Sequence, residues 1–150
     1  FTPIHTNDAL SSIDRLLDIG VEPYLIAGGV RGIISQRLVR KICPRCKQAY
    51  TPSQEELELL GLPQGDYQFY RGTGCSECFH TGYRGRTGVF EILTMTPDMR
   101  RAIHQKDRKA MEEAVRRSTF RPILEDCAHL VAEGITTTEE IVKVIGGQVK

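Results

Sequence analysis

Residues 75–88 read Cys-Ser-Glu-Cys-Phe-His-Thr-Gly-Tyr-Arg-Gly-Arg-Thr-Gly, and this stretch begins with a Cys-x-x-Cys pair, Cys75 and Cys78. A second pair, Cys43 and Cys46, lies upstream, and 28 residues separate the two pairs. Two residues between cysteines let a tight turn direct both sulfurs at one ion, and two such turns make a tetrahedral thiolate cage. Turn-forming residues adjoin both pairs. We therefore expect two knuckles on loops that together hold a structural Zn²⁺ ion.

Cysteines in such pairs can have three other roles. Disulfides form in oxidising compartments, but the chain has an odd number of cysteines, five, and shows no signal peptide. A thioredoxin-like redox motif opens a helix and occurs once rather than twice. An iron site with four thiolates has similar spacing. The spacing therefore favours zinc and leaves iron open.

A zinc ion with four thiolates is a closed centre, with no open coordination position for catalysis. It carries two negative charges, which would change the formal charge of the chain from +1 to −1. The nearby Lys41, Arg45 and Lys47 are expected to offset that charge locally. Few apolar residues surround the pairs, so we expect removal of the ion to unfold the loop.

Two further side chains resemble candidates for chemistry but have simpler interpretations. His80 lies two residues beyond Cys78, and with four cysteines available we interpret it as a solvated loop residue rather than a spare ligand. Cys127 shares a helical face with apolar residues, and no His-Asp arrangement accompanies it. We interpret Cys127 as a small core residue rather than a nucleophile.

Capping residues and apolar periodicity predict the elements before the first cysteine. A strand tail at residues 1–4 leads to a helix that Asn7 or Asp8 caps and Gly20 ends. A second helix is predicted from Pro23 to about Arg40, since five apolar residues recur at helical spacing: Ile26, Val30, Ile33, Ile34 and Leu38.

The remaining elements follow from similar signals. A short helix between the two cysteine pairs starts at Ser53, with Glu56 as its capping-box partner. Strands are expected at residues 67–70 and 86–93. Four helices follow, starting at Pro97, near Asp107, near Pro122 and after Thr137, where Glu140 completes a second capping-box pattern.

Composition excludes several broad classes. Of 150 residues, 40% are hydrophobic and 26% are charged, the balance of a soluble globular protein rather than a disordered one. No apolar run is long enough to span a bilayer, and the near-neutral charge argues against a dedicated nucleic-acid binder. Residues 31–47 are basic with no acidic residue. Contact with phosphate or an acidic partner, and a solvated helix face, are both open interpretations of that run.

The order of these motifs resembles one family, that of type II secretion protein E and the type IV pilus extension ATPases. Residues 1–9, Phe-Thr-Pro-Ile-His-Thr-Asn-Asp-Ala, resemble its histidine box. Residues 34–46, Ile-Ser-Gln-Arg-Leu-Val-Arg-Lys-Ile-Cys-Pro-Arg-Cys, and residues 75–88 resemble its two knuckles and the sequence beside them. Residues 134–140, Gly-Ile-Thr-Thr-Thr-Glu-Glu, resemble its C-terminal end.

The resemblance implies an α/β fold: the C-terminal portion of a RecA-like P-loop ATPase domain with an inserted four-cysteine zinc module and a C-terminal helical subdomain. It divides the chain into residues 1–41 (end of the core, with the histidine box), 42–83 (zinc insertion), 84–96 (core strand) and 97–150 (helical subdomain). It further implies a cytoplasmic homo-hexamer, peripheral to the inner membrane through platform proteins, that hydrolyses ATP with Mg²⁺ to drive pilus or pseudopilus assembly and protein secretion. No nucleic acid is expected as a partner.

Most of the nucleotide machinery of that family is not found in this sequence. A P-loop needs a Gly-Lys dipeptide within G-x-x-x-x-G-K-[ST], and no Gly-Lys occurs in the chain. The acidic strand that holds Mg²⁺ in the family would precede Phe1. We therefore expect a C-terminal fragment that is inactive as an ATPase by itself.

The resemblance assigns one catalytic element to the chain. His5 would lie near the γ-phosphate and couple phosphate loss to domain movement, with Thr6 and Asn7 beside it. An imidazole can donate to a phosphate oxygen or orient water, which suits this role.

Two functions from other classes remain open. One is a stand-alone zinc module that binds nucleic acid or a protein partner through the basic run of residues 31–47, in which case binding would depend on salt. The other is a redox protein in which the cysteine pairs form a reversible disulfide.

Overall fold

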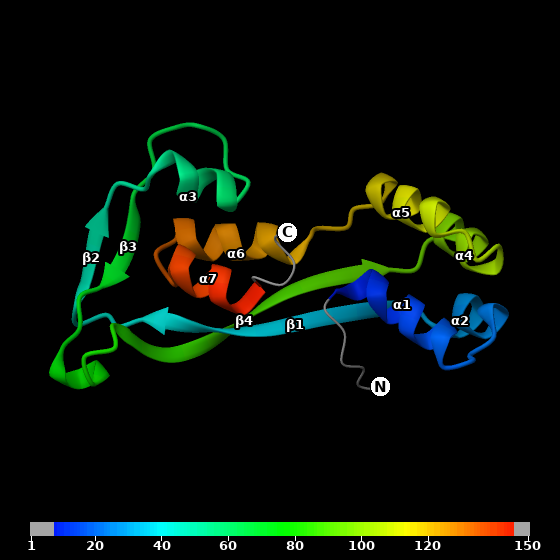
Figure 1. Ribbon diagram of the computed structural model, residues 1–150, viewed down its shortest axis with the longest axis horizontal. Coiled ribbons are helices and arrows are strands. Elements are labelled where there is room, and N and C mark those ends of the chain that lie inside the picture. Colours follow the sequence, from blue (N-terminus) through cyan, green and yellow to red (C-terminus); the bar gives the residue numbers. More distant parts are fainter. Residues whose placement is uncertain (1–7, 146–150) are drawn as a thin grey trace. The chain divides into compact units, whose positions relative to one another are not determined.

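The computed structural model describes residues 8–145, which divide into two compact units. Unit 1 takes in Phe1–Ser35 and Glu91–Pro122, and unit 2 takes in Gln36–Phe90 and Ile123–Lys150, in each case as far as the residues are described. Each unit is therefore built from stretches that are distant in the sequence. The fold is mixed α/β (Figure 1).

The helices are α1 (Ala9–Asp18), α2 (Pro23–Gly29), α3 (Gln54–Leu59), α4 (Pro97–His104), α5 (Arg108–Arg117), α6 (Ile123–Ala132) and α7 (Thr138–Ile145), and a 3₁₀ helix, η1, spans Ser76–Cys78. The strands are β1 (Gly32–Ile42), β2 (Lys47–Tyr50), β3 (Phe69–Gly72) and β4 (Tyr83–Thr94). Within residues 8–145, no helix is both long and apolar enough to cross a membrane.

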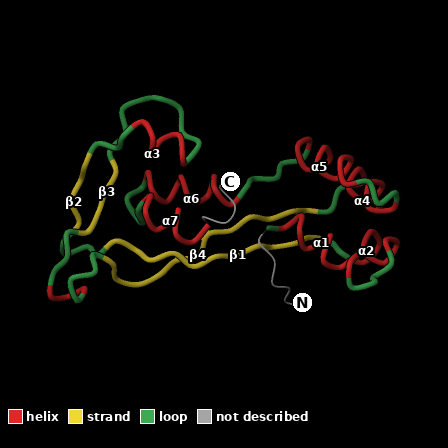
Figure 2. The backbone as a smooth tube through the Cα atoms, viewed as in Figure 1, coloured by secondary structure: helices red, strands yellow, loops and turns green. Residues whose placement is uncertain are grey.

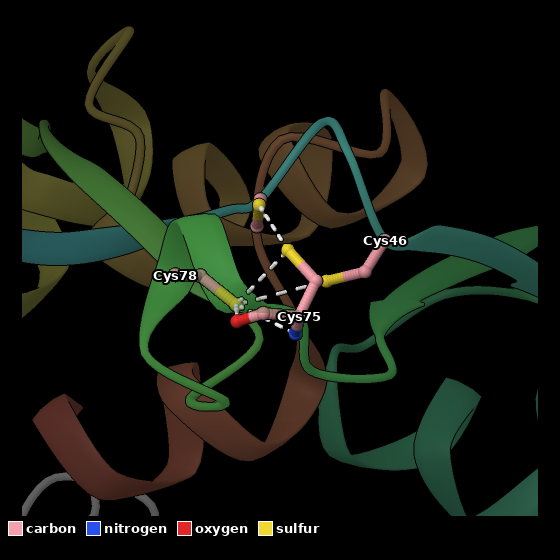
Figure 3. Close-up of side chains that lie close together, drawn as sticks. Cys46, Cys75 and Cys78 are labelled. Atoms are coloured by element: carbon pink, nitrogen blue, oxygen red, sulfur yellow. Dashed lines mark hydrogen bonds between the residues drawn. The ribbon is translucent and has the colours of Figure 1, made fainter.

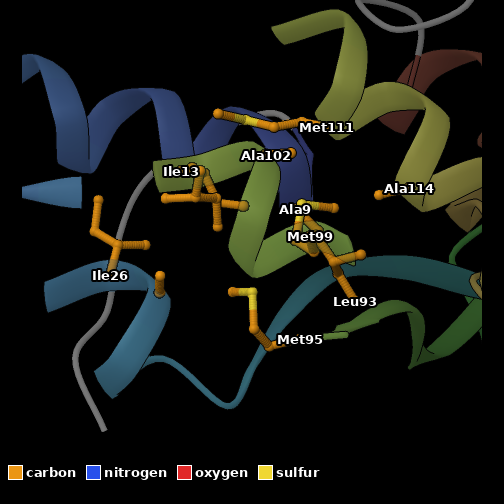
Figure 4. Close-up of a cluster of buried hydrophobic side chains, with 11 residues drawn as sticks. Ala9, Ile13, Ile26, Leu93, Met95, Met99, Ala102, Met111 and Ala114 are labelled. Atoms are coloured by element: carbon orange, nitrogen blue, oxygen red, sulfur yellow. The ribbon is translucent and has the colours of Figure 1, made fainter. Parts of the chain in front are cut away.

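Unit 1 contains α1, α2, α4 and α5. The carboxylate of Asp8 caps α1 by accepting the Ser11 N–H at 2.7 Å, which confirms one of the two predicted caps. Helix α2 packs against α4, and α4 packs against α5. The amphipathic faces of these helices bury a core that includes methionines (Figure 4); its largest side chains are Ile13, Ile26, Leu93, Met95, Met99, Ile103 and Met111.

Unit 2 contains the cysteine pairs and two strand pairs. Strands β2 and β3 lie side by side (Figure 2). They pair antiparallel, with Lys47 opposite Gly72 and Tyr50 opposite Phe69. The unit's core includes Phe69, which is completely buried, together with apolar residues from β1, β4, α3, α6 and α7. Strand β1 pairs with β4, and their arrows point in opposite directions in Figure 1. The division between the units falls within both strands, after Ser35 in β1 and after Phe90 in β4.

The predicted helix from Pro23 to Arg40 is wrong beyond Gly29. Helix α2 ends there, and strand β1 follows. Along β1 burial alternates with a period of two, so Val39 is completely buried whereas Ile34 and Leu38, expected on the apolar helix face, are 62% and 53% exposed. Glycines at the end of α2 and β-branched residues after it favour the strand. The apolar positions fit both the helical period of about 3.6 residues and the strand period of two, and the chain adopts the strand.

The other predicted elements lie close to their expected places. Ser53 and Glu56 form both halves of the capping box of α3. Helices α4 and α5 are capped by Thr96 and Asp107, and β4 contains the whole predicted strand of residues 86–93. The strand expected at residues 67–70 occurs two residues later, as β3, and its partner β2 was not predicted. The strand tail expected at residues 1–4 lies outside the described residues.

Candidate metal centre

The four cysteines of the two Cys-x-x-Cys pairs meet at one point of unit 2. Cys43 directly follows β1, and Cys46 directly precedes β2. Cys75 directly precedes η1, and Cys78 is the last residue of η1. Their four sulfur atoms all lie within 4.8 Å of one another. In Figure 3 the side chains of Cys46, Cys75 and Cys78 converge with their sulfurs pointing inward. Two knuckles from separate segments thus form a single cluster, as the spacing predicted.

The distances between the sulfur atoms fit four thiolates around a tetrahedrally coordinated ion rather than disulfide bonds. Cys43 and Cys75 have their Sγ atoms 3.8 Å apart, as do Cys46 and Cys78, and Cys75 and Cys78 are 3.7 Å apart. Metal–sulfur bonds of about 2.3 Å place sulfurs about 3.8 Å apart at the corners of a tetrahedron, whereas a disulfide needs about 2.05 Å. All four are free cysteines. The cluster can hold a metal ion.

Backbone N–H groups point at the sulfurs. The N–H of Gly74 donates to Cys46 Sγ at 3.3 Å, and the N–H groups of Cys75 and Gly82 both donate to Cys78 Sγ at 3.2 Å. Hydrogen bonds to a thiolate favour its charged form and fix its orientation. The glycines and turns around the pairs therefore supply a second layer of donors around the cluster.

The thiols of this cluster influence one another's ionisation. Burial alone would raise the pKa of Cys78, but the backbone N–H groups of Cys75 and Gly82, together with the thiols of Cys75 and Cys46, outweigh burial, and the pKa of Cys78 is lowered. The neighbouring Cys46 is affected mainly by burial, which raises its pKa. Adjacent thiols resist simultaneous ionisation because their charges repel. A bound dication removes that obstacle, so the donor set is suited to a metal that takes four thiolates.

The second knuckle depends on two glycines whose backbones cross. A side chain on Gly72 would place its Cβ 2.1 Å from the carbonyl oxygen of Gly82, and a side chain on Gly82 would place its Cβ 2.6 Å from that of Gly72. Gly82 also has a positive φ of 80°. Glycine at both positions allows the approach that directs the Gly82 N–H at Cys78.

Charged side chains surround the cluster in part as expected. Glu77, between the second pair of cysteines, forms ion pairs of 3.1 Å with both Arg45 and Arg84. Lys47 instead lies over the Tyr70 ring, with its ammonium 4.5 Å from the centroid. Of the three cations expected to offset the thiolate charge, Arg45 is therefore tied to a carboxylate beside the cluster.

His80 and Cys127 behave as interpreted from the sequence. The His80 side chain is exposed and does not belong to the four-cysteine group. The backbone N–H of His80 donates to the Cys75 carbonyl at 2.8 Å. Cys127 is completely buried in the apolar core of unit 2, where burial raises the pKa of its thiol to about 12. Such a thiol is a core residue and a poor nucleophile.

The basic run of residues 31–47 lies mainly on a strand rather than on a solvated helix face. Arg40 is engaged by the buried carboxylate of Glu140 at 2.9 Å, and Arg45 pairs with Glu77. Arg40 and Arg45 of this run thus form ion pairs with carboxylates of the same chain. His5, Thr6 and Asn7 lie outside the described residues, so their predicted roles keep the status of predictions.

The amide donors Gly74 and Gly82 were not identified from sequence. The available signal was the glycines that flank the second pair, since a glycine beside a metal knuckle often lets a backbone N–H approach a sulfur.

Comparison with known proteins assigns the chain to a family. The model of the family described as "Type II/IV secretion system protein" matches residues 1–143. The chain belongs to this family.

The similar members of the secretion family are much longer proteins. The type II secretion system protein E of Pseudomonas aeruginosa is 39% identical over 142 residues, 94% of this chain and 28% of the relative. The type II secretion system ATPase E of Vibrio cholerae is 40% identical over 143 residues, 94% of this chain and 28% of the relative. The type IV pilus assembly ATPase PilB of Thermus thermophilus is 40% identical over 142 residues, 92% of this chain and 16% of the relative. The chain thus spans little more than a quarter of the secretion relatives.

Proposed function

We propose that this chain is the part of a secretion or pilus-assembly ATPase that lies C-terminal to the P-loop, and that the whole enzyme hydrolyses ATP to drive pseudopilus or pilus assembly and protein secretion. The main support is the convergence of four cysteine sulfurs within 4.8 Å inside a chain that the secretion family model matches over residues 1–143. Of two relatives that are each 40% identical, one is named a type II secretion system ATPase and the other a type IV pilus assembly ATPase.

In this proposal, Cys43, Cys46, Cys75 and Cys78 hold one Zn²⁺ ion. Bound zinc supplies no catalysis here, since four thiolates close its coordination sphere. The purified chain should contain about one zinc ion per molecule and little iron, measured by inductively coupled plasma mass spectrometry. Iron at a similar ratio, or no metal after purification without chelators, would contradict the zinc assignment.

His5 is proposed as the residue that couples loss of the γ-phosphate to movement, with Thr6 and Asn7 beside it. The segment that carries them leads directly into a firmly held helix. The Ala9 N–H donates at 2.6 Å to Glu91, a carboxylate that is only 5% exposed, and Asp8 caps the same helix end. A histidine placed just before such an anchor can transmit a small displacement to unit 1.

The wider assignments belong to the same proposal. The RecA-like fold, the division at residues 41, 83 and 96, the homo-hexamer, Mg²⁺ with ATP, and docking on inner-membrane platform proteins at the cytoplasmic face all follow from the family resemblance. The chain alone is proposed to be inactive, because its sequence contains no Gly-Lys dipeptide for a P-loop.

The catalytic proposal is tested in the longest protein that carries this sequence. Its ATPase activity should depend on ATP and Mg²⁺, and His5→Ala should lower kcat by about 100-fold or more while ATP binding changes little. His80→Ala is the matched control, because His80 is an exposed histidine outside the cluster. Unchanged turnover in His5→Ala would remove the coupling role. The isolated 150-residue chain should show no ATPase activity.

The alternative, a stand-alone zinc module that binds nucleic acid or a partner through residues 31–47, has weaker support. Arg40 and Arg45 of that run are occupied by Glu140 and Glu77. Salt-dependent binding of DNA or RNA by the isolated chain would favour it over the ATPase proposal.

A further inference from the structure

Glu140 on α7 holds strand β1 with both of its carboxylate oxygens. Oε1 accepts the backbone N–H of Arg40 at 3.0 Å, and Oε2 accepts from the guanidinium of the same residue at 3.1 and 2.9 Å. Glu140 is only 4% exposed. A buried carboxylate needs such partners to remain charged. Burial alone would raise its pKa, but the hydrogen bonds from Arg40 outweigh burial, and the pKa of Glu140 is lowered.

The three residues that precede α7 extend this contact to more of the backbone. The Ile42 N–H donates to the Ile135 carbonyl at 2.8 Å, and the Thr136 hydroxyl donates to the Arg40 carbonyl at 2.8 Å. The hydroxyls of Thr137 and Tyr83 lie 2.6 Å apart. Together, Ile135, Thr136, Thr137 and Glu140 form what we call the C-terminal clamp.

The clamp forms hydrogen bonds to both strands next to the cysteine cluster. On β1 it holds Arg40 and Ile42, the residues just before Cys43. On β4 it holds Tyr83, which also lies under the Arg40 guanidinium, 4.1 Å from its carbon to the ring centroid. The Cys43 N–H donates to the Gly82 carbonyl at 2.9 Å, which joins the two strands at the cluster itself. The clamp therefore holds the ends of both knuckles.

We propose that Glu140 is a positioning residue for the metal centre, so that retention of the ion depends on a carboxylate 97 residues beyond Cys43 in the sequence. The inference rests on the proposed zinc site. Metal binding must order the ligands, and that cost is smaller when the supporting backbone is already in place. Loss of the clamp leaves the four sulfurs intact but frees the strand end that carries Cys43. The ion then escapes more easily.

The test is the rate of zinc release from the purified 150-residue chain to an excess of the chromophoric chelator 4-(2-pyridylazo)resorcinol, well below the unfolding temperature. Glu140→Gln keeps the side-chain shape but removes the charge that pairs with Arg40. It should release zinc about ten-fold faster, the effect typical of changes in residues that orient metal ligands. Thr136→Val, which removes only the hydroxyl bonded to Arg40, is a second variant and should shift the rate in the same direction.

Asp126→Asn is the matched control. Asp126 on α6 also accepts a strand N–H, from Phe90 at 2.8 Å, but it acts on β4 well beyond the cysteines in sequence. Its release rate should stay within about two-fold of the wild-type rate, because this carboxylate does not hold either knuckle.

Three outcomes would overturn the inference. Equal release from wild type, Glu140→Gln and Thr136→Val would remove the positioning role while leaving the zinc site intact. Equally fast release from Asp126→Asn would show a general effect of weakening unit 2. A wild-type chain that binds no zinc would remove the proposed metal centre itself, and this result is distinguishable because it requires no variant.

Discussion

Phe79 combines two unfavourable properties in one residue. It follows η1 with a left-handed backbone, φ 53° and ψ 38°, and its side chain is 87% exposed. A left-handed conformation costs a residue with a Cβ roughly 1–2 kcal/mol, and asparagine tolerates it better. The knuckle thus adopts a conformation that its own sequence disfavours at this position.

Phe79→Asn should therefore stabilise the zinc-loaded chain, by about 1 kcal/mol, measured by urea unfolding. Tyr24→Asn is the control, since Tyr24 is also exposed, at 60%, but lies within helix α2. That change should give no gain, because asparagine is a weaker helix former in α2. A lower stability of Phe79→Asn would contradict the backbone argument.

The five cysteines divide into two kinds. Cys43 lies in the cluster, whereas Cys127 lies in an apolar core with a pKa raised by burial to about 12. Cys43→Ser should reduce zinc from about one ion per chain to a small fraction, because hydroxyl is a poor zinc ligand. Cys127→Ala should keep the zinc. The zinc content of both variants measures this difference. Zinc loss from Cys127→Ala would count against the division into cluster and core cysteines.

At the scale of elements, the sequence predicts the structure where the signal is local. Ser53, Thr96 and Asp107 cap their helices through contacts only three residues long, so a short window contains the whole interaction. The four cysteines of the cluster were also predictable, because each Cys-x-x-Cys pair brings two sulfurs together in one turn. Strand β1 was missed because its apolar spacing fits two periods and only its pairing with β4 decides between them.

Glu140 illustrates what a sequence window cannot contain. The pattern Thr137-x-x-Glu140 predicted a capping box, and the Thr137 hydroxyl does accept the Glu140 N–H at 3.0 Å. The carboxylate, however, binds Arg40, 100 residues away. A local motif correctly predicted the start of α7 and gave no indication that its glutamate serves another element.

The lowered pKa of Glu140 has a consequence for the acid stability of unit 2. Hydrogen bonds from Arg40 outweigh burial, so the folded pKa lies below the unfolded value of about 4.3. The stabilisation from this pair is therefore complete above that pH and is lost as the pH falls through the folded pKa. Urea unfolding should show the stability gap between wild type and Glu140→Gln narrowing below pH 4.3. A difference in unfolding free energy that widens on acidification would contradict a lowered pKa for Glu140.

At the scale of the molecule, we expect the two units to depend on the proposed zinc ion to different degrees. The core of unit 1 consists of apolar side chains from α1, α2, α4, α5 and the end of β4, whereas the cysteine cluster belongs to unit 2. Removal of zinc with EDTA should therefore increase amide hydrogen exchange at residues 43–50 and 69–82, with little change in α4 and α5. Peptide-level mass spectrometry measures both. Exchange that rises equally in α4 and α5 would mean that the units unfold together.

Each unit is built from two stretches that are separated in the sequence, so the parts of each core are synthesised at different times. Helices α1 and α2 are synthesised before the cysteine pairs, but Met99, Ile103 and Met111, which complete the core around Ile13 and Ile26, follow only after both pairs. The C-terminal clamp is synthesised after all of these residues. During translation, which adds about 5–20 residues per second, all four thiols are therefore synthesised while neither unit has a finished core. The nascent chain is open to zinc, and to oxidants, for several seconds before its fold can protect it.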